Sequence, residues 1–178
     1  MLPCQPHMKP RGKSISRGCT TEETSPVEST GYGRQETRAV ASVLHLFRAP
    51  KRRLPMEEIP ETEAVQDSGI EGCAHARPGG KRQVLLVDRE TLDAMSLCPG
   101  IIRENITTEG LNVNSLLPGQ QLRVGQARLE VSAACTPCDQ LEKLRPGLRR
   151  EIRGRRGMLC RVIAGGTIRR GDPIEKVV

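Results

Sequence analysis

The chain has 178 residues, which fits one ordinary domain with an extension and is long enough to bury a core without disulfide bonds. Aromatic residues make up only 1% and Trp is absent, so the core must be aliphatic. The aromatic platforms on which single-strand nucleic-acid binders stack bases are therefore nearly excluded, although the net charge of +7 favours partners that carry phosphate groups.

The positive charge is concentrated in one segment. Between Arg145 and Arg156 the chain has six arginines and one acid, Glu151, which gives a net charge of +5 there. This density predicts attraction of an anionic partner, whether nucleic acid, phospholipid or an anionic cofactor. An arginine-rich surface that is merely solvated has the same pattern.

The seven cysteines lack the regular spacing of a disulfide framework. No apolar run approaches the ~20 residues needed to span a bilayer, and the amino terminus lacks the apolar segment of a secretory signal. We therefore expect no membrane insertion, a reducing compartment and a cytoplasmic location, with thiols that are free or bound to metal.

The first part of the chain, residues 1–38, is rich in Pro, Gly, Ser, Thr and charged residues, and it shows almost no apolar periodicity. Such a stretch cannot bury enough apolar surface to offset its ordering entropy, so it is predicted to be a disordered tail. A globular domain is expected over 39–178. It begins with an apolar run of strand length at 39–46, and a second short strand is expected over Ile59–Val65.

The clearest buried strand is expected over Arg82–Asp88, where four consecutive branched aliphatic residues are bounded by polar ones. Asp88 is a suitable N-cap for a short helix over Arg89–Ser96. After the Pro99-Gly100 break, a further strand is predicted over Ile101–Ile106.

Two alternating runs, Leu122–Val124 and Ala127–Ala133, are joined by Gly125-Gln126, which is a strong hairpin signal. Short strands and turns recur through the rest of the chain, with one or two short helices between them. This pattern is typical of a mainly β fold, a barrel or closed sheet with helical inserts. Later elements are expected at 140–144 (helix), 158–164, 167–168 and 173–177 (strands).

Cys138 is the strongest candidate for chemistry. It follows a strand and Pro137 and precedes a helical pattern, and a helix N-terminus favours the thiolate, which is the form that acts as nucleophile and metal ligand. With Cys135 it forms C-x-x-C, which is also compatible with a redox dithiol or half a zinc site, although no second pair follows at zinc spacing. A buried, inert thiol is the plain alternative.

Polar residues between the strands form a second group of candidates. His75 can orient a substrate or exchange protons. Arg103 and Asn105 alternate in the predicted strand, so both are expected to face one pocket and bind an oxyanion. Ordinary polar residues at the mouth of a barrel would look the same.

These separate patterns occur in one order that resembles the MOSC domain, the C-terminal domain of molybdenum cofactor sulfurases, which also occurs as small standalone bacterial proteins. The resemblance covers roughly residues 40–178. The matching pieces are Gly69-Ile70-Glu71-Gly72-x-x-His75-Ala76, Arg82-Gln83-Val84-Leu85-Leu86, Arg103 to Leu111, Leu117-Pro118-Gly119, Pro137-Cys138-x-x-Leu141, and Gly157-x-x-Cys160-Arg161-Val162 followed by Gly165-Gly166 and Gly171-Asp172.

The resemblance implies a MOSC-like β-barrel with a single functional cysteine, which falls on Cys138. In the family this thiol is proposed to carry sulfur as a persulfide or to ligate molybdenum, so Cys138 is both the expected catalytic residue and the expected metal ligand. The residues expected to bind molybdenum cofactor are His75, Arg82, Arg103 and Asn105. A sulfur donor protein or an anionic cofactor is the expected partner, and enzymatic activity would be sulfur transfer or molybdenum-dependent reduction.

The sequence departs from the family pattern in two ways. The family usually has Gly-Asp where this chain has Gly72-Cys73, which removes an acid that could orient His75 and adds a thiol. The N-terminal β-barrel of the cofactor-binding relatives and the pyridoxal-phosphate domain of full-length sulfurases have no counterpart here, so no pyridoxal-phosphate site is expected. The rival functions are a basic nucleic-acid-binding barrel, which the lack of aromatics disfavours, and an adaptor with inert thiols.

Overall fold

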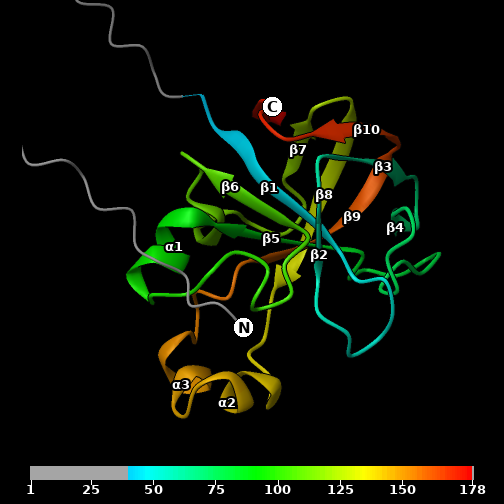
Figure 1. Cartoon of the computed structure of the whole chain (residues 1–178). Helices are drawn as coiled ribbons and strands as arrows, with labels where there is room; N and C mark the ends of the chain where they lie inside the picture. The colour runs from blue at the N-terminus through cyan, green and yellow to red at the C-terminus, as the bar shows by residue number, and fades with distance from the viewer. Residues whose placement is uncertain (1–39, 178) are drawn as a thin grey trace, which may run out of the picture. The chain divides into compact units, whose positions relative to one another are not determined.

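The structure of the chain is a computed structural model that describes residues 40–177. The tail predicted over 1–38 lies outside these residues. The described part holds eleven strands, three short helices and one 3-10 turn (Figure 1). They are β1 Ser42–Arg48, β2 Glu57–Ile59, β3 Glu61–Val65, β4 Gly69–Ile70, β5 Val84–Asp88, α1 Arg89–Ala94, β6 Ile106–Glu109, η1 Val113–Ser115, β7 Gln121–Val124, β8 Ala127–Ala134, α2 Gln140–Leu144, α3 Leu148–Glu151, β9 Met158–Ala164, β10 Gly166–Arg169 and β11 Ile174–Val177.

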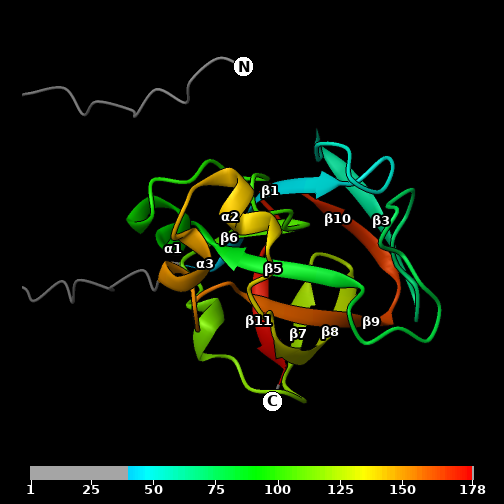
Figure 2. The ribbon, with the colours of Figure 1, turned by 90° about the horizontal axis from the view of Figure 1, so that it is seen from below.

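The prediction of a mainly β fold is confirmed. Eight strands form one sheet in the order β11-β7-β8-β9-β5-β6-β1-β2, and a smaller sheet has the order β10-β3-β4. All pairings are antiparallel except that of β5 with β6. Figure 2 shows β5 and β9 side by side across the centre, with α2 and α3 at one end of the sheet. In the described residues no helix is long and apolar enough to cross a membrane.

The expected closed barrel is a less accurate description than a curled, open sheet, because β11 and β2 remain at the two edges of the large sheet. The start of β1 nevertheless approaches the start of β11. Ser42 and Pro173 form an isolated bridge, and the Val43 N–H donates to the Asp172 carbonyl at 2.9 Å. These few hydrogen bonds are too short a ladder to count as closure.

Strand β5 lies between two aliphatic cores. All five of its residues are buried, and they alternate as a strand must. Leu86 packs in the large core within the sheets, whereas Leu85 and Val87 pack in a second core with residues of α1, α2 and α3. Burial of each such side chain stabilises the fold by about 1.5–3 kcal/mol. The continuous apolar run in the sequence thus reflects burial on both faces.

The predicted helix start and hairpin are both confirmed. The Asp88 carboxylate accepts from the Thr91 N–H at 2.7 Å at the start of α1, as an N-cap should. Strands β7 and β8 pair with Val124 opposite Ala127, and Gly125 at the turn has φ +56°.

The strand predicted over Ile101–Ile106 is wrong for most of its length, because β6 begins only at Ile106. A turn precedes it. The Arg103 N–H donates to the Gly100 carbonyl at 3.1 Å, and Arg103 itself has φ +68°. The buried Glu104 carboxyl also accepts from the Gly100 N–H at 2.5 Å, which holds this turn together. Three polar residues in succession, Arg103 to Asn105, therefore lie on a loop.

Candidate functional site

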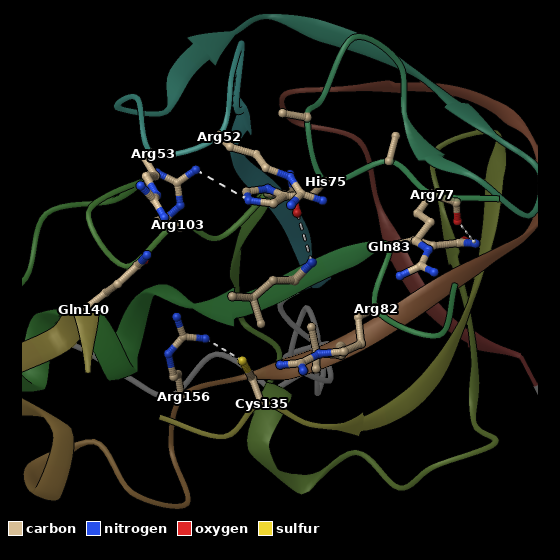
Figure 3. Close-up of a pocket in the computed structure, with 15 residues that line it drawn as sticks. Arg52, Arg53, His75, Arg77, Arg82, Gln83, Arg103, Cys135, Gln140 and Arg156 are labelled. Carbon is tan, nitrogen blue, oxygen red and sulfur yellow. Dashed lines mark hydrogen bonds between the residues drawn. The ribbon is translucent and has the colours of Figure 1, made fainter. Parts of the chain in front are cut away.

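One cavity of about 540 Å³ gathers most of the polar residues singled out by the sequence (Figure 3). It is formed by segments that are far apart in the chain. Figure 3 shows Arg53 and Arg103 on one side, and Arg156 with Cys135 on another. The lining residues are Arg52, Arg53, Ala74, His75, Ala76, Arg77, Arg82, Gln83, Leu85, Arg103, Asn105, Cys135, Gln140, Arg156 and Leu159.

The charge of the lining is its main feature, because six of these residues are arginines and none is Asp or Glu. Guanidinium groups bind carboxylates and phosphates through a planar fork of N–H donors. So many cations facing one cavity repel each other unless an anion lies between them. Such a lining is chemically suited to an anionic ligand with several oxygen acceptors.

Arg156 is the most constrained of the six arginines, with only 8% of its surface exposed. Its Nη2 donates to the Ile102 carbonyl at 3.1 Å and its Nη1 to the thiol of Cys135, whereas its Nε has no hydrogen-bond partner among the described residues. It forms no salt bridge there. A buried guanidinium with spare donors is costly unless a ligand satisfies it.

A buried acid within the field of Arg156, Glu104, does not pair with it. Glu104 is fully buried, and this burial raises the pKa of its carboxyl despite hydrogen bonds from Gly100 and Thr107 and the field of Arg156. Its Oε2 has no partner among residues 40–177. Burial thus favours the neutral form of the carboxyl and leaves Arg156 available to an anion.

The two thiols of the C-x-x-C motif lie in different environments. Cys135 directly follows β8, is buried and lines the cavity, and its N–H donates to the Gly157 carbonyl at 2.9 Å. Cys138 is exposed, two residues before α2, and does not line the cavity. The chemical role predicted for Cys138 stays a prediction. Cys135 was missed as the cavity thiol, because the register of β8 shifts between Val131 and Ala133 and strand alternation from Leu129 and Val131 does not predict where Cys135 points.

Four residues predicted to bind the cofactor surround the same cavity: His75, Arg82, Arg103 and Asn105. The reason given for two of them was wrong, since Arg103 and Asn105 come from a loop rather than from one face of a strand. Sequence reasoning missed Arg52, Arg53 and Arg77, which stand in Pro- and Gly-rich connections. Their only signal was positive charge in a loop.

Behind the cavity wall lies a third thiol, Cys73, which is buried and contacts three nitrogen groups. These are the Ala49 N–H at 3.4 Å, Asn105 Nδ2 at 3.5 Å and His75 Nδ1 at 3.7 Å. Burial by itself would raise the pKa of Cys73, but the hydrogen bonds and the field of His75 outweigh it and lower the pKa to about 7. For Cys160, burial is the cause of the shift and raises the pKa to about 12.

The basic segment contributes less free charge than its sequence suggests. Arg145 forms an ion pair with Glu151 at 2.6 Å and Arg149 one with Asp139 at 2.5 Å. Of the arginines in this segment, only Arg156 lines the cavity. The zinc alternative also finds no support in residues 40–177, where no three His, Cys, Asp or Glu side chains are placed to hold a metal ion.

Comparisons with known proteins agree with this architecture. Residues 74–175, more than half of the chain, match the family described as the MOSC domain. Among solved structures, the YuaD protein from Bacillus subtilis aligns with a TM-score of 0.66 and 20% identity, covering 76% of this chain and 94% of that one. YiiM from Geobacillus stearothermophilus aligns with a TM-score of 0.65 and 18% identity, covering 78% and 75%. YiiM from Escherichia coli gives 0.58 and 22%, covering 75% and 69%. No curated protein matches the chain significantly.

Proposed function

Because the chain belongs to the MOSC domain family, we propose that it handles sulfur or molybdenum and holds the anionic part of a molybdenum cofactor in its arginine-rich cavity. The observation that carries this proposal is the composition of the lining, six arginines and a thiol with no acid. Family membership supports a link to molybdenum cofactor biology in general, and the cavity suggests how this chain takes part in it.

The donor set fits such a cofactor. Arg82, Arg103 and Arg156 would hold phosphate or carboxylate oxygens, and Asn105 and His75 stand beside them. A thiolate is a soft ligand of the kind that suits molybdenum, and the proposed metal ligand is Cys138, which is exposed and lies outside the cavity lining. When bound, the cofactor would supply a redox-active metal centre. The protein's own contribution is to bind, orient and neutralise the anion.

Sulfur transfer makes the same demand on Cys138, namely an accessible and deprotonated sulfur. The thiolate would attack the outer sulfur of a donor persulfide, R–S–SH. The donor S–S bond breaks, R–S⁻ leaves, and the protein carries Cys–S–SH. The exposure of Cys138 supports contact with a donor protein, whereas Cys135 is enclosed and contacts Arg156.

A loading experiment tests the role of the thiol. The full chain is treated with glutathione persulfide, and persulfides are mapped by mass spectrometry, together with elemental analysis for molybdenum in protein purified from cells. We expect loading at Cys138, loss of loading in Cys138→Ser, and unchanged loading in Cys98→Ser, which alters a thiol outside the cavity lining. Undiminished persulfide and molybdenum in Cys138→Ser would refute this role.

A binding experiment tests the cavity separately, with inorganic phosphate as the probe in a calorimeter. Replacing Arg156 with Met removes a buried cation but keeps an unbranched side chain of similar length. A charge-assisted hydrogen bond contributes about 1.5–3 kcal/mol, so phosphate affinity should fall roughly tenfold to a hundredfold. The exposed control Arg153→Met should bind as the native chain does. Equal affinity in both variants would argue against an anion site in this cavity.

A further inference from the structure

The hydrogen bonds around Cys73 define which atom donates at each contact. Asn105 is oriented by the backbone, because its Oδ1 accepts from the Leu85 N–H at 3.1 Å and its Nδ2 donates to the Phe47 carbonyl at 3.2 Å. The group that faces Cys73 Sγ at 3.5 Å is therefore the amide NH₂, a donor. The Ala49 N–H, at 3.4 Å, is a second donor.

The third contact is settled from the opposite side of the imidazole ring. Nε2 of His75 lies 3.5 Å from Nη2 of Arg103, and a guanidinium can only donate. Nε2 must then be the acceptor, which in a neutral imidazole leaves the proton on Nδ1. Nδ1 lies 3.7 Å from Cys73 Sγ and points a third N–H at the sulfur.

Three N–H groups therefore point at Cys73 Sγ. Hydrogen bonds donated to a sulfur stabilise its ionised form, and none of these three neighbours could accept a hydrogen bond from a thiol S–H. We propose that Cys73 is a thiolate that holds His75 in the Nδ1–H tautomer and so presents Nε2 to the arginine-rich cavity as a proton acceptor for a protonated oxyanion such as hydrogen phosphate. Despite burial, hydrogen bonds of this kind lower the pKa of Cys73 to about 7, which agrees with this ionisation. Cys73 is a positioning residue in this arrangement, because it does not line the cavity itself.

An acceptor at His75 Nε2 complements the other groups that line the cavity. Apart from His75, the charged groups in its lining are the guanidinium groups, which can only donate hydrogen bonds. A hydrogen phosphate needs donors for its charged oxygens and one acceptor for its hydroxyl. The unpartnered Nε of the buried Arg156 is a second sign that an anion belongs there. On binding, Arg103 Nη2 would release His75 Nε2 and donate to a phosphate oxygen instead. The phosphate O–H bond would then break and an N–H bond would form at the freed Nε2, leaving an imidazolium between the thiolate and a phosphate dianion.

The charged groups near Cys73 are compatible with a thiolate. His75 contacts it directly, Arg103 acts through the far side of the imidazole ring, and Arg48 lies beside Gly72, where Nη1 would be 3.5 Å from an added Cβ. All of these are cations or N–H donors. The family pattern usually has an acid at the position of Cys73. In this chain the Cys73 thiolate would orient His75 in place of that acid.

This inference rests on the proposed anion site for its purpose, but its test needs no ligand. Two-dimensional ¹H–¹⁵N spectra of the imidazole nitrogens distinguish a protonated ring nitrogen from an unprotonated one, and His75→Gln identifies the signals of His75. In the native chain we expect a protonated Nδ1 and an unprotonated Nε2. Cys73→Ala should lose this preference, and Cys73→Asp, which restores an anion, should keep it. A protonated Nε2 in the native chain, or no change in Cys73→Ala, would overturn the proposal.

A second measurement covers the case in which Cys73→Ala folds poorly. Thiolates absorb far-ultraviolet light more strongly than thiols do, so the absorbance of the folded native chain should show a thiolate step near pH 7 that is absent in Cys73→Ser and present in Cys98→Ser. In His75→Leu the midpoint should move up towards the ordinary thiol value of ~8.5. An unmoved midpoint would contradict the role of His75. If His75 has the expected Nδ1–H tautomer but the chain fails to bind phosphate, the proposed anion site is rejected and the inference about Cys73 and His75 still holds.

Discussion

The glycine after Arg156 offers the sharpest test of how the fold positions the site. Gly157 has φ +88°, and a Cβ added there would overlap the Leu86 carbonyl oxygen and come within 2.8 Å of Val87 Cγ2. Both atoms belong to β5, a strand buried on both faces. The Gly157 carbonyl also accepts from the Cys135 N–H. Gly157→Ala must therefore push β9 away from β5 and disturb both Arg156 and Cys135.

The magnitude follows from two separable costs. A left-handed residue with a Cβ costs about 1–2 kcal/mol, and overpacking in a rigid core costs about 1–3 kcal/mol more. Gly154→Ala is a matched control, because Gly154 has φ +76° with nothing within 4 Å of an added Cβ, so it carries only the first cost. We expect Gly157→Ala to lose about 3 kcal/mol of unfolding free energy in urea, and Gly154→Ala about 1 kcal/mol.

The difference in unfolding free energy between Gly157→Ala and Gly154→Ala tests whether β9 packs closely against β5. If urea unfolding shows equal losses for both, the close approach of β9 to β5 does not exist and the position of Arg156 is not determined in this way. Phosphate binding provides a second readout, since Gly157→Ala should weaken it and Gly154→Ala should not.

Burial raises the pKa of Glu104, so its neutral form stabilises the fold below the ordinary Glu pKa of ~4.3, and that contribution is lost as pH rises through the raised value. Glu104→Gln should therefore flatten the decline of stability with rising pH in this window, and an unchanged pH profile from urea unfolding at several pH values would contradict the burial argument. Alkylation of the native chain, followed by mass spectrometry, should show the exposed Cys138 reacting at least tenfold faster than Cys160, because the Cys160 thiol is buried and its pKa is raised to about 12. Similar rates would show that the core around Cys160 opens readily. Asp88→Ala removes the N-cap of α1 and the carboxylate that accepts from Asn114 Nδ2 at 3.0 Å. Thermal unfolding should show a loss of about 1–2 kcal/mol in unfolding free energy, whereas Asp88→Asn should retain most of the stability.

The sequence predicted local elements well where one physical signal dominated. The aliphatic run of β5, the Asp88 cap of α1 and the Gly125 turn each depend on residues adjacent in the chain, and all three are present. The prediction failed over Ile101–Ile106, where apolar residues alone suggested a strand. The deciding contact there, from the Gly100 N–H to a buried Glu104 carboxyl, joins two residues whose ionisation and burial no pattern reveals.

For the site, the sequence by itself determined the kinds of groups: arginines, a histidine, an amide and thiols at the ends of strands. Only the tertiary structure decided which of them meet. It gathered six arginines from separate segments around one cavity, directed Cys135 rather than Cys138 towards it, and placed Cys73 behind His75. The physical reason is that alternation along a strand depends only on neighbouring residues. Burial and hydrogen-bond partners instead depend on contacts between residues far apart in the sequence, such as Arg156 and Ile102.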